Sequence, residues 1–250
     1  MEQNKPLKVL VLNGSPKGDN SSTMYVTKAF VDGIKEVTNA SVEYVNINSL
    51  NVKPCIGCLS CWARTEGECI IRNDDIVPFK EKILNADIFI ESFPLYFFGM
   101  PGTVKVFTDR MLSMMNTYRG QGAPEDGKSF HGIRNPKPER RFVIISSCAY
   151  TEASTIYEPL KMQYDYICGK GEYTFIGVPQ LKTLIDLKNE KKITRYLSKF
   201  KEAGIEFAKN GKLSKETEDN LLKPPFTESG YKVFLDNFWT EEEEKGKNLK

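Results

Sequence analysis

Histidine is almost absent from this chain: one residue, His131, stands among 250. Histidine is the side chain most often used as a general base near neutral pH, so its scarcity argues against a Cys/His nucleophilic pair. His131 falls in a polar segment, where we expect it to be exposed to solvent. No cluster of acidic residues indicates a hydrolytic metal centre. We therefore expect any chemistry to reside on a bound cofactor.

Long hydrophobic runs and an excess of charge of one sign are also missing. No apolar run approaches the roughly 18 residues that a membrane-spanning helix needs. Lysine and arginine together number 35 and aspartate and glutamate 33, which leaves a formal net charge of +2. This near balance gives no electrostatic basis for binding nucleic acid or an anionic membrane surface. We expect neither as a partner.

The first residues, MEQNKPLK, lack the apolar core of a secretory signal and run directly into a strand pattern. A chain without an export signal is expected to be cytoplasmic. Its six cysteines are then expected to be reduced thiols or metal ligands rather than disulfides.

Five short strand-like runs alternate with helical patterns along the chain. The strands are predicted at residues 7–13, 42–48, 87–92, 141–147 and 173–178. The helices are predicted at about residues 21–37, 74–85, 101–115, 154–168 and 189–209. This alternation predicts an α/β fold: a doubly wound, five-stranded parallel sheet in the flavodoxin-like order.

The C-terminal part of the chain has a different character. We assign residues 1–210 to one domain and 211–250 to a C-terminal helical extension. Pro224 and Pro225 interrupt the chain, and aromatic residues with helical spacing follow. These residues are Tyr231, Phe234, Leu235, Phe238 and Trp239. They predict a short amphipathic helix that packs on its own domain or contacts a partner subunit, followed by ten frayed residues.

A loop rich in hydroxyl groups, GSPKGDNSST at residues 14–23, joins the first strand to the first helix. Ligands of doubly wound sheets bind beyond the carboxyl ends of the strands, and a helix N-terminus favours phosphate. The loop matches neither G-x-G-x-x-G nor G-x-x-x-x-G-K-[ST], which excludes the dinucleotide and NTPase fingerprints. Its serine and threonine hydroxyls, up to Thr23, and its one lysine suit the terminal phosphate of a mononucleotide.

A second loop, SFPLYFFGMPG at residues 92–102, follows the third strand and is dense in aromatic residues. Its backbone can hydrogen-bond the edge of a flat heterocycle while Tyr96 and Phe97 lie against the face of the ring. Phe93 and Phe98 can be core residues beneath the loop, and this interpretation is compatible with ring binding by the others. Residues 146–151, after the fourth strand, are expected to border the same crevice.

Four cysteines lie in the loop at residues 49–72, within the stretch CIGCLSCWARTEGEC. They are Cys55, Cys58, Cys61 and Cys69. Thiolates at this spacing on a turning loop can surround a compact inorganic centre, and C-x2-C-x2-C suits an iron–sulfur cluster. Structural zinc more often uses two C-x2-C pairs held apart. Zinc and unligated thiols remain as alternatives.

Three segments together resemble a known family. NGSPKGDNSS, CIGCLSCW…GEC…DD and SFPLYFFGMPGTVKVFTDR are similar to the NADPH-dependent FMN reductase branch of the flavodoxin-like proteins. They resemble most closely its iron–sulfur flavoprotein subgroup. The resemblance is specific over about residues 7–110 and extends, as fold alone, to about residue 210.

The resemblance implies a bound FMN and assigns its contacts. The phosphate would be held by Ser15, Lys17, Ser21 and Ser22. The isoalloxazine ring would be held by Pro94, Leu95, Tyr96 and Phe97. The four cysteines would hold a 4Fe–4S cluster. In the motif's helix, Lys105, Asp109 and Arg110 are expected to form structural ion pairs.

The resemblance also implies a function. Electrons would pass from NAD(P)H, or from ferredoxin, to a quinone, a flavin or another small acceptor, in a homodimer or a dimer of dimers. Residues 116–140 would form a lid over the flavin or an arm to the other subunit. Three alternatives remain open: a cluster-free reductase, an FMN-binding one-electron carrier that serves a protein partner, and a regulatory module with a redox-sensing or zinc-stabilised cysteine loop.

Overall fold

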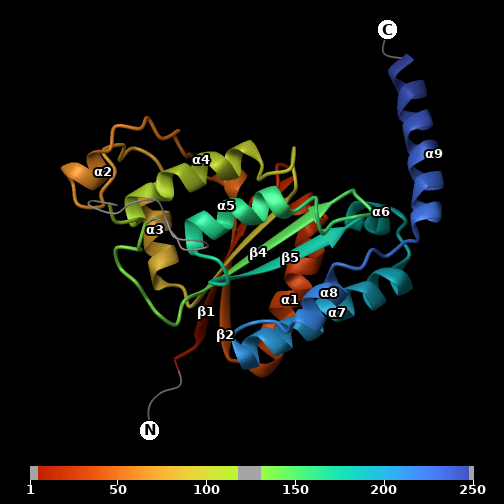
Figure 1. Cartoon of the computed structure of the whole chain (residues 1–250), viewed down its shortest axis with the longest axis horizontal. Coiled ribbons are helices and arrows are strands. Elements are labelled where there is room, and N and C mark those ends of the chain that lie inside the picture. Colours follow the sequence, from red (N-terminus) through yellow and green to blue (C-terminus); the bar gives the residue numbers. More distant parts are fainter. Residues whose placement is uncertain (1–4, 118–130, 248–250) are drawn as a thin grey trace.

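A single parallel sheet organises the molecule (Figure 1). The computed structural model describes residues 5–117 and 131–247. The strands are β1 Leu7–Asn13, β2 Ala40–Asn46, β3 Ile88–Pro94, β4 Arg141–Cys148 and β5 Tyr173–Pro179. Their order is β2-β1-β3-β4-β5, and every neighbouring pair is parallel. The predicted α/β fold with a five-stranded, flavodoxin-like sheet is confirmed.

Helices cover both faces of this sheet, as Figure 1 shows. One face carries α1 Thr23–Val37 and α7 Glu190–Asn210, with the shorter α6 Leu181–Asp186 and α8 Lys215–Leu221. The other face carries α3 Ile76–Asn85, α4 Gly102–Arg110 and α5 Glu158–Cys168. Among the described residues, no helix is long and apolar enough to span a bilayer.

Burial explains why the strand runs could be recognised. β3, at the centre of the sheet, buries six consecutive residues, and β1 buries five. A strand covered by helices on both faces needs apolar residues on both, which produces a continuous rather than an alternating pattern. β2 is an edge strand, and its residues are half-buried or exposed.

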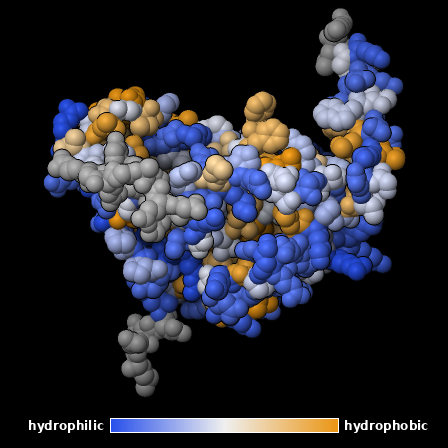
Figure 2. All heavy atoms as spheres, viewed as in Figure 1, coloured by the Kyte–Doolittle hydropathy of each residue, from blue (hydrophilic) through white to orange (hydrophobic). Residues whose placement is uncertain are grey.

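The extension beyond residue 210 holds two helices. α8 contributes Leu221 to the core beneath α7, so core packing continues past residue 210. The division into residues 1–210 and 211–250 stays a prediction. The last helix, α9 Glu228–Lys247, is 20 residues long, and Figure 1 shows it extending away from the body. Figure 2 shows hydrophobic side chains gathered towards its base and hydrophilic ones towards its end.

Two details of the predicted tail are wrong. The amphipathic helix is not short, and the final ten residues are not simply a frayed end, because α9 continues through residues 241–247. Glutamate and lysine have high helix propensity, and Lys245 pairs with Glu242 one turn away. Three short helices were also not predicted: α6, α8 and α2 Ser60–Ala63, which lies inside the cysteine loop.

Glycines let α1 and α7 approach closely. A Cβ atom placed on Gly204 would lie 1.9 Å from the carbonyl oxygen of Phe30. A Cβ atom on Gly33 would lie 2.0 Å from the carbonyl oxygen of Lys201. The contacting atoms are backbone, so neither helix could yield by moving a side chain.

We predict that Gly204→Ala lowers the free energy of unfolding by about 1–3 kcal/mol, because the added methyl group forces the two helices apart. Gly102→Ala is the matched control, since a Cβ atom there has no neighbour within 4 Å. Denaturant titrations of both variants and the parent measure the difference. Equal stability of the two variants would show that the close approach is unimportant.

Candidate functional site: three loops and a cysteine loop

The loop after β1 is shaped by hydrogen bonds within the protein. Asn13 donates from Nδ2 to the carbonyl oxygen of Gly18 at 2.8 Å, and its Oδ1 accepts from the backbone N–H of Ser15 at 3.1 Å. From the other side, Asn48 donates to the carbonyl oxygens of Ser15 at 3.2 Å and Pro16 at 3.0 Å. Asn48 was not singled out from the sequence, because both of its partners are more than thirty residues away.

The structure places the predicted phosphate-binding residues together at this loop. Ser15 and Ser21 are buried, Ser22 is half-buried at the start of α1, and Lys17 is exposed. η1 Gly18–Asn20 completes the turn, and Gly18 has a φ of 54°, in the left-handed region that favours glycine. The turn therefore places Ser21 and Ser22 at the N-terminus of α1, the positive end of its dipole.

Thr23 has a different role from the one expected. It is 1% exposed, and its hydroxyl shares a hydrogen bond of 2.6 Å with Ser147 of β4. One turn later, Thr27 shares a hydrogen bond of 2.7 Å with Ser92 of β3. These buried hydroxyl pairs fix α1 against two neighbouring strands directly beneath the loop.

The aromatic loop after β3 is a tight hairpin turn. The backbone N–H of Tyr96 donates to the carbonyl oxygen of Gly99, and that of Gly99 donates back to Tyr96, both at 2.9 Å. The two residues between them, Phe97 and Phe98, have φ values of 49° and 63°. Both lie in the left-handed region, which costs a non-glycine residue about 1–2 kcal/mol.

The aromatic side chains of this turn are presented outward. Phe97 is 100% exposed and Tyr96 is 45% exposed. Phe93 belongs to the core, as the alternative interpretation proposed, but Phe98 does not: it is exposed and stacks on Tyr150, with ring centroids 6.0 Å apart.

The loop after β4 borders the same edge of the sheet. Leu95 donates its backbone N–H to the carbonyl oxygen of Ser147 at 2.7 Å, which ties the aromatic loop to β4. Tyr150 belongs to this third loop. Because β1, β3 and β4 are neighbouring parallel strands, their carboxyl-end loops form one continuous rim. One end of the rim carries the serine hydroxyls and the N-terminus of α1, and the other end carries aromatic side chains.

The cysteine loop brings four thiols into one region without joining them. Cys55 and Cys58 are exposed, Cys61 and Cys69 are half-buried, and all four are free. Burial raises the pKa of the Cys61 thiol, and the charges of the other three thiols add to that rise. Over residues 5–117 and 131–247, no three His, Cys, Asp or Glu side chains are arranged to hold a metal ion. The donor set has the right chemistry for a cluster, and the loop would have to close for the thiols to converge.

A buried ion pair holds the ends of this loop. Arg110 donates to both carboxylate oxygens of Asp74, and both side chains are 0% exposed. The same guanidinium donates to the carbonyl oxygens of Lys53 at 2.7 Å and Ile71 at 3.0 Å, on either side of the cysteines. Burial opposes ionisation of Asp74, but hydrogen bonds from Arg110 and backbone amides hold its pKa below the ordinary value.

The expected structural ion pairs are therefore present. Lys105 pairs with Asp109 on the exposed face of α4, and Arg110 pairs with Asp74 in the interior. His131 is half-buried rather than exposed to solvent, with its ring 4.7 Å from that of Trp62. Residues 116, 117 and 131–140 of the predicted lid or arm are described, and 118–130 lie outside the described residues.

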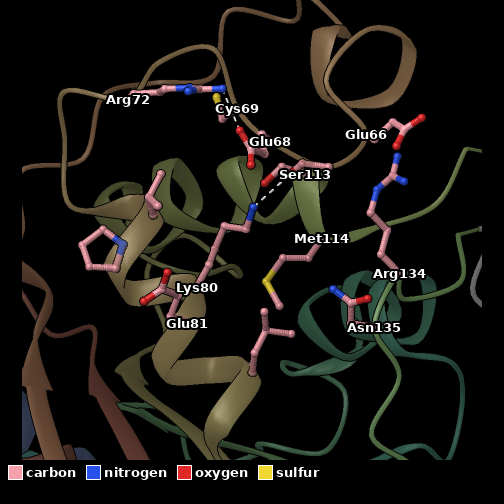
Figure 3. A pocket seen from close by; sticks show the side chains of 14 residues that line it. Glu66, Glu68, Cys69, Arg72, Lys80, Glu81, Ser113, Met114, Arg134 and Asn135 are labelled. Atoms are coloured by element: carbon pink, nitrogen blue, oxygen red, sulfur yellow. Dashed lines mark hydrogen bonds and ion pairs between the residues drawn. The ribbon is translucent and has the colours of Figure 1, made fainter.

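A cavity of about 670 Å³ lies between the cysteine loop and α3 (Figure 3). Lys80 of α3 donates to the carbonyl oxygen of Gly67 at 3.0 Å across its interior. Burial lowers the pKa of Lys80, opposed by the charges of Cys69 and Cys61. The cavity borders Cys69 and is separate from the rim formed by the three loops.

We predict that Asp74→Asn lowers the free energy of unfolding by about 3–5 kcal/mol at pH 7, because it leaves the Arg110 charge buried without a counter-charge. The folded-state pKa of Asp74 is depressed, so the stabilisation is present above the unfolded pKa and is lost as pH falls through the folded one. The difference between parent and variant should therefore shrink towards pH 3, as measured by urea titrations.

Asp109→Asn is the control for this prediction. It breaks the half-exposed pair with Lys105 and should cost less than about 1 kcal/mol at any pH. A pH-independent difference for Asp74→Asn would contradict the assigned role of its carboxylate.

Comparisons with known proteins identify relatives by sequence and by fold. Relatives include an iron–sulfur flavoprotein of Clostridioides difficile, 31% identical over 107 residues, which cover 43% of this chain and 47% of the relative. An iron–sulfur flavoprotein of Methanocaldococcus jannaschii is 33% identical over 104 residues, 42% of this chain and 51% of the relative. The chain thus spans about half the length of these relatives.

Solved structures share the fold. The NAD(P)H:quinone oxidoreductase from Methanothermobacter marburgensis superposes with a TM-score of 0.57 at 19% identity, over 81% of this chain and 96% of that one. An FMN-dependent NADH-azoreductase from Bacillus anthracis, in complex with FMN, gives 0.56 at 19% identity, over 81% and 99%. A family model described as the flavodoxin-like fold matches residues 7–202. The chain therefore belongs to the family of proteins with the flavodoxin-like fold.

Proposed function

We propose that this protein is an FMN-dependent oxidoreductase that passes electrons from NAD(P)H to a quinone, a flavin or another small electron-poor acceptor. The observation that carries the proposal is the rim: a preshaped phosphate loop and a strained aromatic turn meet at the ends of neighbouring strands. Relatives named as an FMN-dependent NADH:quinone oxidoreductase and as iron–sulfur flavoproteins support it.

The described residues suit FMN in chemistry and position. Ser15, Lys17, Ser21 and Ser22 would hold its phosphate through hydroxyls, an ammonium group and the N-terminus of α1. The turn at residues 94–97 would hold its ring between backbone amides and aromatic faces. When bound, FMN supplies the two-electron chemistry, and the protein needs no acid–base pair of its own.

The protein's part in the reaction is to orient the bound FMN and to enclose it. Asn13 and Asn48 keep the phosphate loop in its binding shape before the ligand arrives, so less ordering is needed on binding. The buried pairs of Thr23 with Ser147 and Thr27 with Ser92 hold α1 in register with the rim. The turn at Phe97 then sets the position of the ring relative to the phosphate.

We further propose that Cys55, Cys58, Cys61 and Cys69 hold a 4Fe–4S cluster. Four free thiols in one loop, three of them at C-x2-C-x2-C spacing, and the names of the relatives support this. A cluster would allow electrons to leave one at a time. Cys55 and Cys58 are exposed, so a protein partner such as ferredoxin could approach, which favours the one-electron carrier as the second candidate function.

The protein is proposed to act as a homodimer or a dimer of dimers. The lid or arm at residues 116–140 stays a prediction. Rapid bleaching of the flavin by NAD(P)H alone would support the reductase, and bleaching only after reduced ferredoxin is added would support the carrier.

We predict that Lys17→Ala weakens FMN binding by about 10- to 100-fold, because a charge-assisted hydrogen bond to phosphate is worth about 1.5–3 kcal/mol. Riboflavin lacks the phosphate, so its affinity should not change. Flavin fluorescence titrations of the apoprotein measure both. Lys28→Ala, an exposed lysine further along α1, is the control. A parent protein that neither contains nor binds FMN would overturn the proposed function.

Anaerobically purified protein is predicted to contain four iron and four acid-labile sulfide per chain, since a 4Fe–4S cluster has that composition. Cys58→Ala should lose the iron and retain FMN, whereas Cys168→Ala, outside the loop, should keep both. Iron and sulfide assays with an optical spectrum measure the outcome. Stoichiometric zinc, or iron retained in Cys58→Ala, would exclude the proposed ligand set.

A further inference from the structure

The cavity between the cysteine loop and α3 has no part in the proposed function. Its volume of about 670 Å³ lies within the roughly 300–1,000 Å³ typical of small-molecule sites. Part of its wall is apolar, from Leu84 of α3 and Met114 of η3 Met111–Met114. Two cations from different elements, Lys80 and Arg134, also line it (Figure 3). An apolar space with a few convergent polar groups is the usual form of a ligand site.

The wall that the cysteine loop contributes is held in shape by close contacts. Gly67 has a φ of 99°, and its backbone N–H donates to the carbonyl oxygen of Cys61 at 2.7 Å. A Cβ atom on Gly67 would lie 2.7 Å from Cδ of Arg134 and 3.2 Å from the carbonyl oxygen of Ser113. The absence of a side chain thus lets the loop pack directly against both of these residues. The cavity is therefore bounded by tightly packed backbone on this side.

Lys80 carries a charge that no carboxylate balances. The residue is half-buried, and its ammonium group donates to the carbonyl oxygen of Gly67 at 3.0 Å. An ammonium group has three donors, so this bond leaves two of them for other acceptors. Within residues 5–117 and 131–247, Lys80 forms no ion pair. Burying a cation without a counter-charge is costly, which favours an anion at this position.

Arg134 has a similarly incomplete set of partners. Its Nη2 donates to the carbonyl oxygen of Cys61 at 3.2 Å, and its Nε is buried without a hydrogen-bond acceptor among the described residues. Figure 3 shows the exposed carboxylate of Glu66 above Arg134, without an ion pair between them. Lys80 and Arg134 therefore both bond backbone carbonyl oxygens of one loop and keep their charge at one cavity.

Three exposed glutamates also line the cavity and limit the charge of a ligand. They are Glu66, Glu68 and Glu81, and Glu68 pairs with Arg72 at 2.6 Å. Their carboxylates would repel a second negative group on the ligand. The site therefore suits a molecule with one negative group and an apolar body. Methionine sulfur makes favourable contacts with aromatic rings, so Met114 favours a ring over an aliphatic chain.

We propose that this cavity binds an aromatic monocarboxylate, whose carboxylate contacts Lys80 and Arg134 and whose ring lies against Leu84 and Met114. Charge-assisted hydrogen bonds orient the ligand, and burial of the ring adds affinity. The cavity is separate from the rim, so this site goes beyond the proposed function and does not rest on it.

Isothermal titration calorimetry with 2-naphthoate tests the charge requirement. The parent should bind it at one site, and Lys80→Met should weaken binding about 10- to 100-fold, as expected for losing a hydrogen bond from a charged group. Arg134→Met should act in the same direction. Lys82→Met is the matched control, because Lys82 lies on α3 but pairs with Glu43 of β2. No binding by the parent, or equal weakening by Lys82→Met, overturns the inference.

The neutral analogue 2-naphthamide separates the loss of charge from the loss of the cavity. It should bind the parent at least about ten-fold more weakly than 2-naphthoate, because it offers the two cations no negative charge. Lys80→Met should leave this weaker affinity unchanged. Equal affinity of the parent for the two compounds would show that the carboxylate is not recognised and would overturn the inference, whatever the stability of the variants.

Methionine methyl NMR tests where the ligand lies. 2-Naphthoate should shift the methyl resonance of Met114, assigned with Met114→Leu, and leave that of Met100 in the aromatic loop unchanged. A shift of Met100 without one of Met114 overturns the inference. The titrations are repeated with FMN, which should leave the affinity for 2-naphthoate unchanged. A protein that binds 2-naphthoate but not FMN would refute the proposed function and leave this site intact.

Discussion

The parallel pairing of β1 with β3 and of β3 with β4 is the constraint on which the rest of the molecule depends. It brings three loops from distant parts of the sequence to one edge, and it requires helices on both faces because every strand residue then needs cover. Hydroxyl pairs between α1 and the strands β3 and β4 fix the position of the helix relative to these strands close to the rim. The loop after β1 can therefore keep its shape although it contains little apolar surface.

The cysteine loop is held mainly by polar contacts. It has short elements only, and four of its residues have positive φ: Gly57, Leu59, Glu66 and Gly67. Its attachment to the domain depends on polar contacts, chiefly the Arg110 guanidinium, which bonds the loop on both sides of the cysteines and faces Asp74. The middle of the loop is bonded as well, because Lys80 donates to the carbonyl oxygen of Gly67 at 3.0 Å and Arg134 to that of Cys61 at 3.2 Å.

Hydrophobic periodicity in the sequence predicted the elements whose residues are buried in a regular pattern. The strands and the five main helices follow from burial on one or both sides, which leaves a periodic trace in the sequence. The loop that contains Ser15, Lys17 and Ser21 could be placed at the edge of the sheet because a strand, a hydroxyl-rich turn and a helix follow one another directly in the sequence. The roles of Asn48 and Tyr231 could not be predicted, because each forms a hydrogen bond with a loop that is distant in the sequence. The residues next to them in the sequence do not indicate which loop that is. Phe98 was misjudged in part because an aromatic residue near a strand usually belongs to the core, and only the turn geometry turns it outward.

Asn48 has a consequence for how the edge of the sheet behaves. Its amide reaches from the segment after β2 to the carbonyl oxygens of Ser15 and Pro16. β2 is the least protected strand and would otherwise open first in local fluctuations. A ligand that fixes the loop also fixes the two carbonyl oxygens that accept hydrogen bonds from Asn48. Part of the binding free energy therefore stabilises β2 at the edge of the sheet. Saturation of the site should thus slow amide hydrogen exchange along an edge that no ligand atom touches.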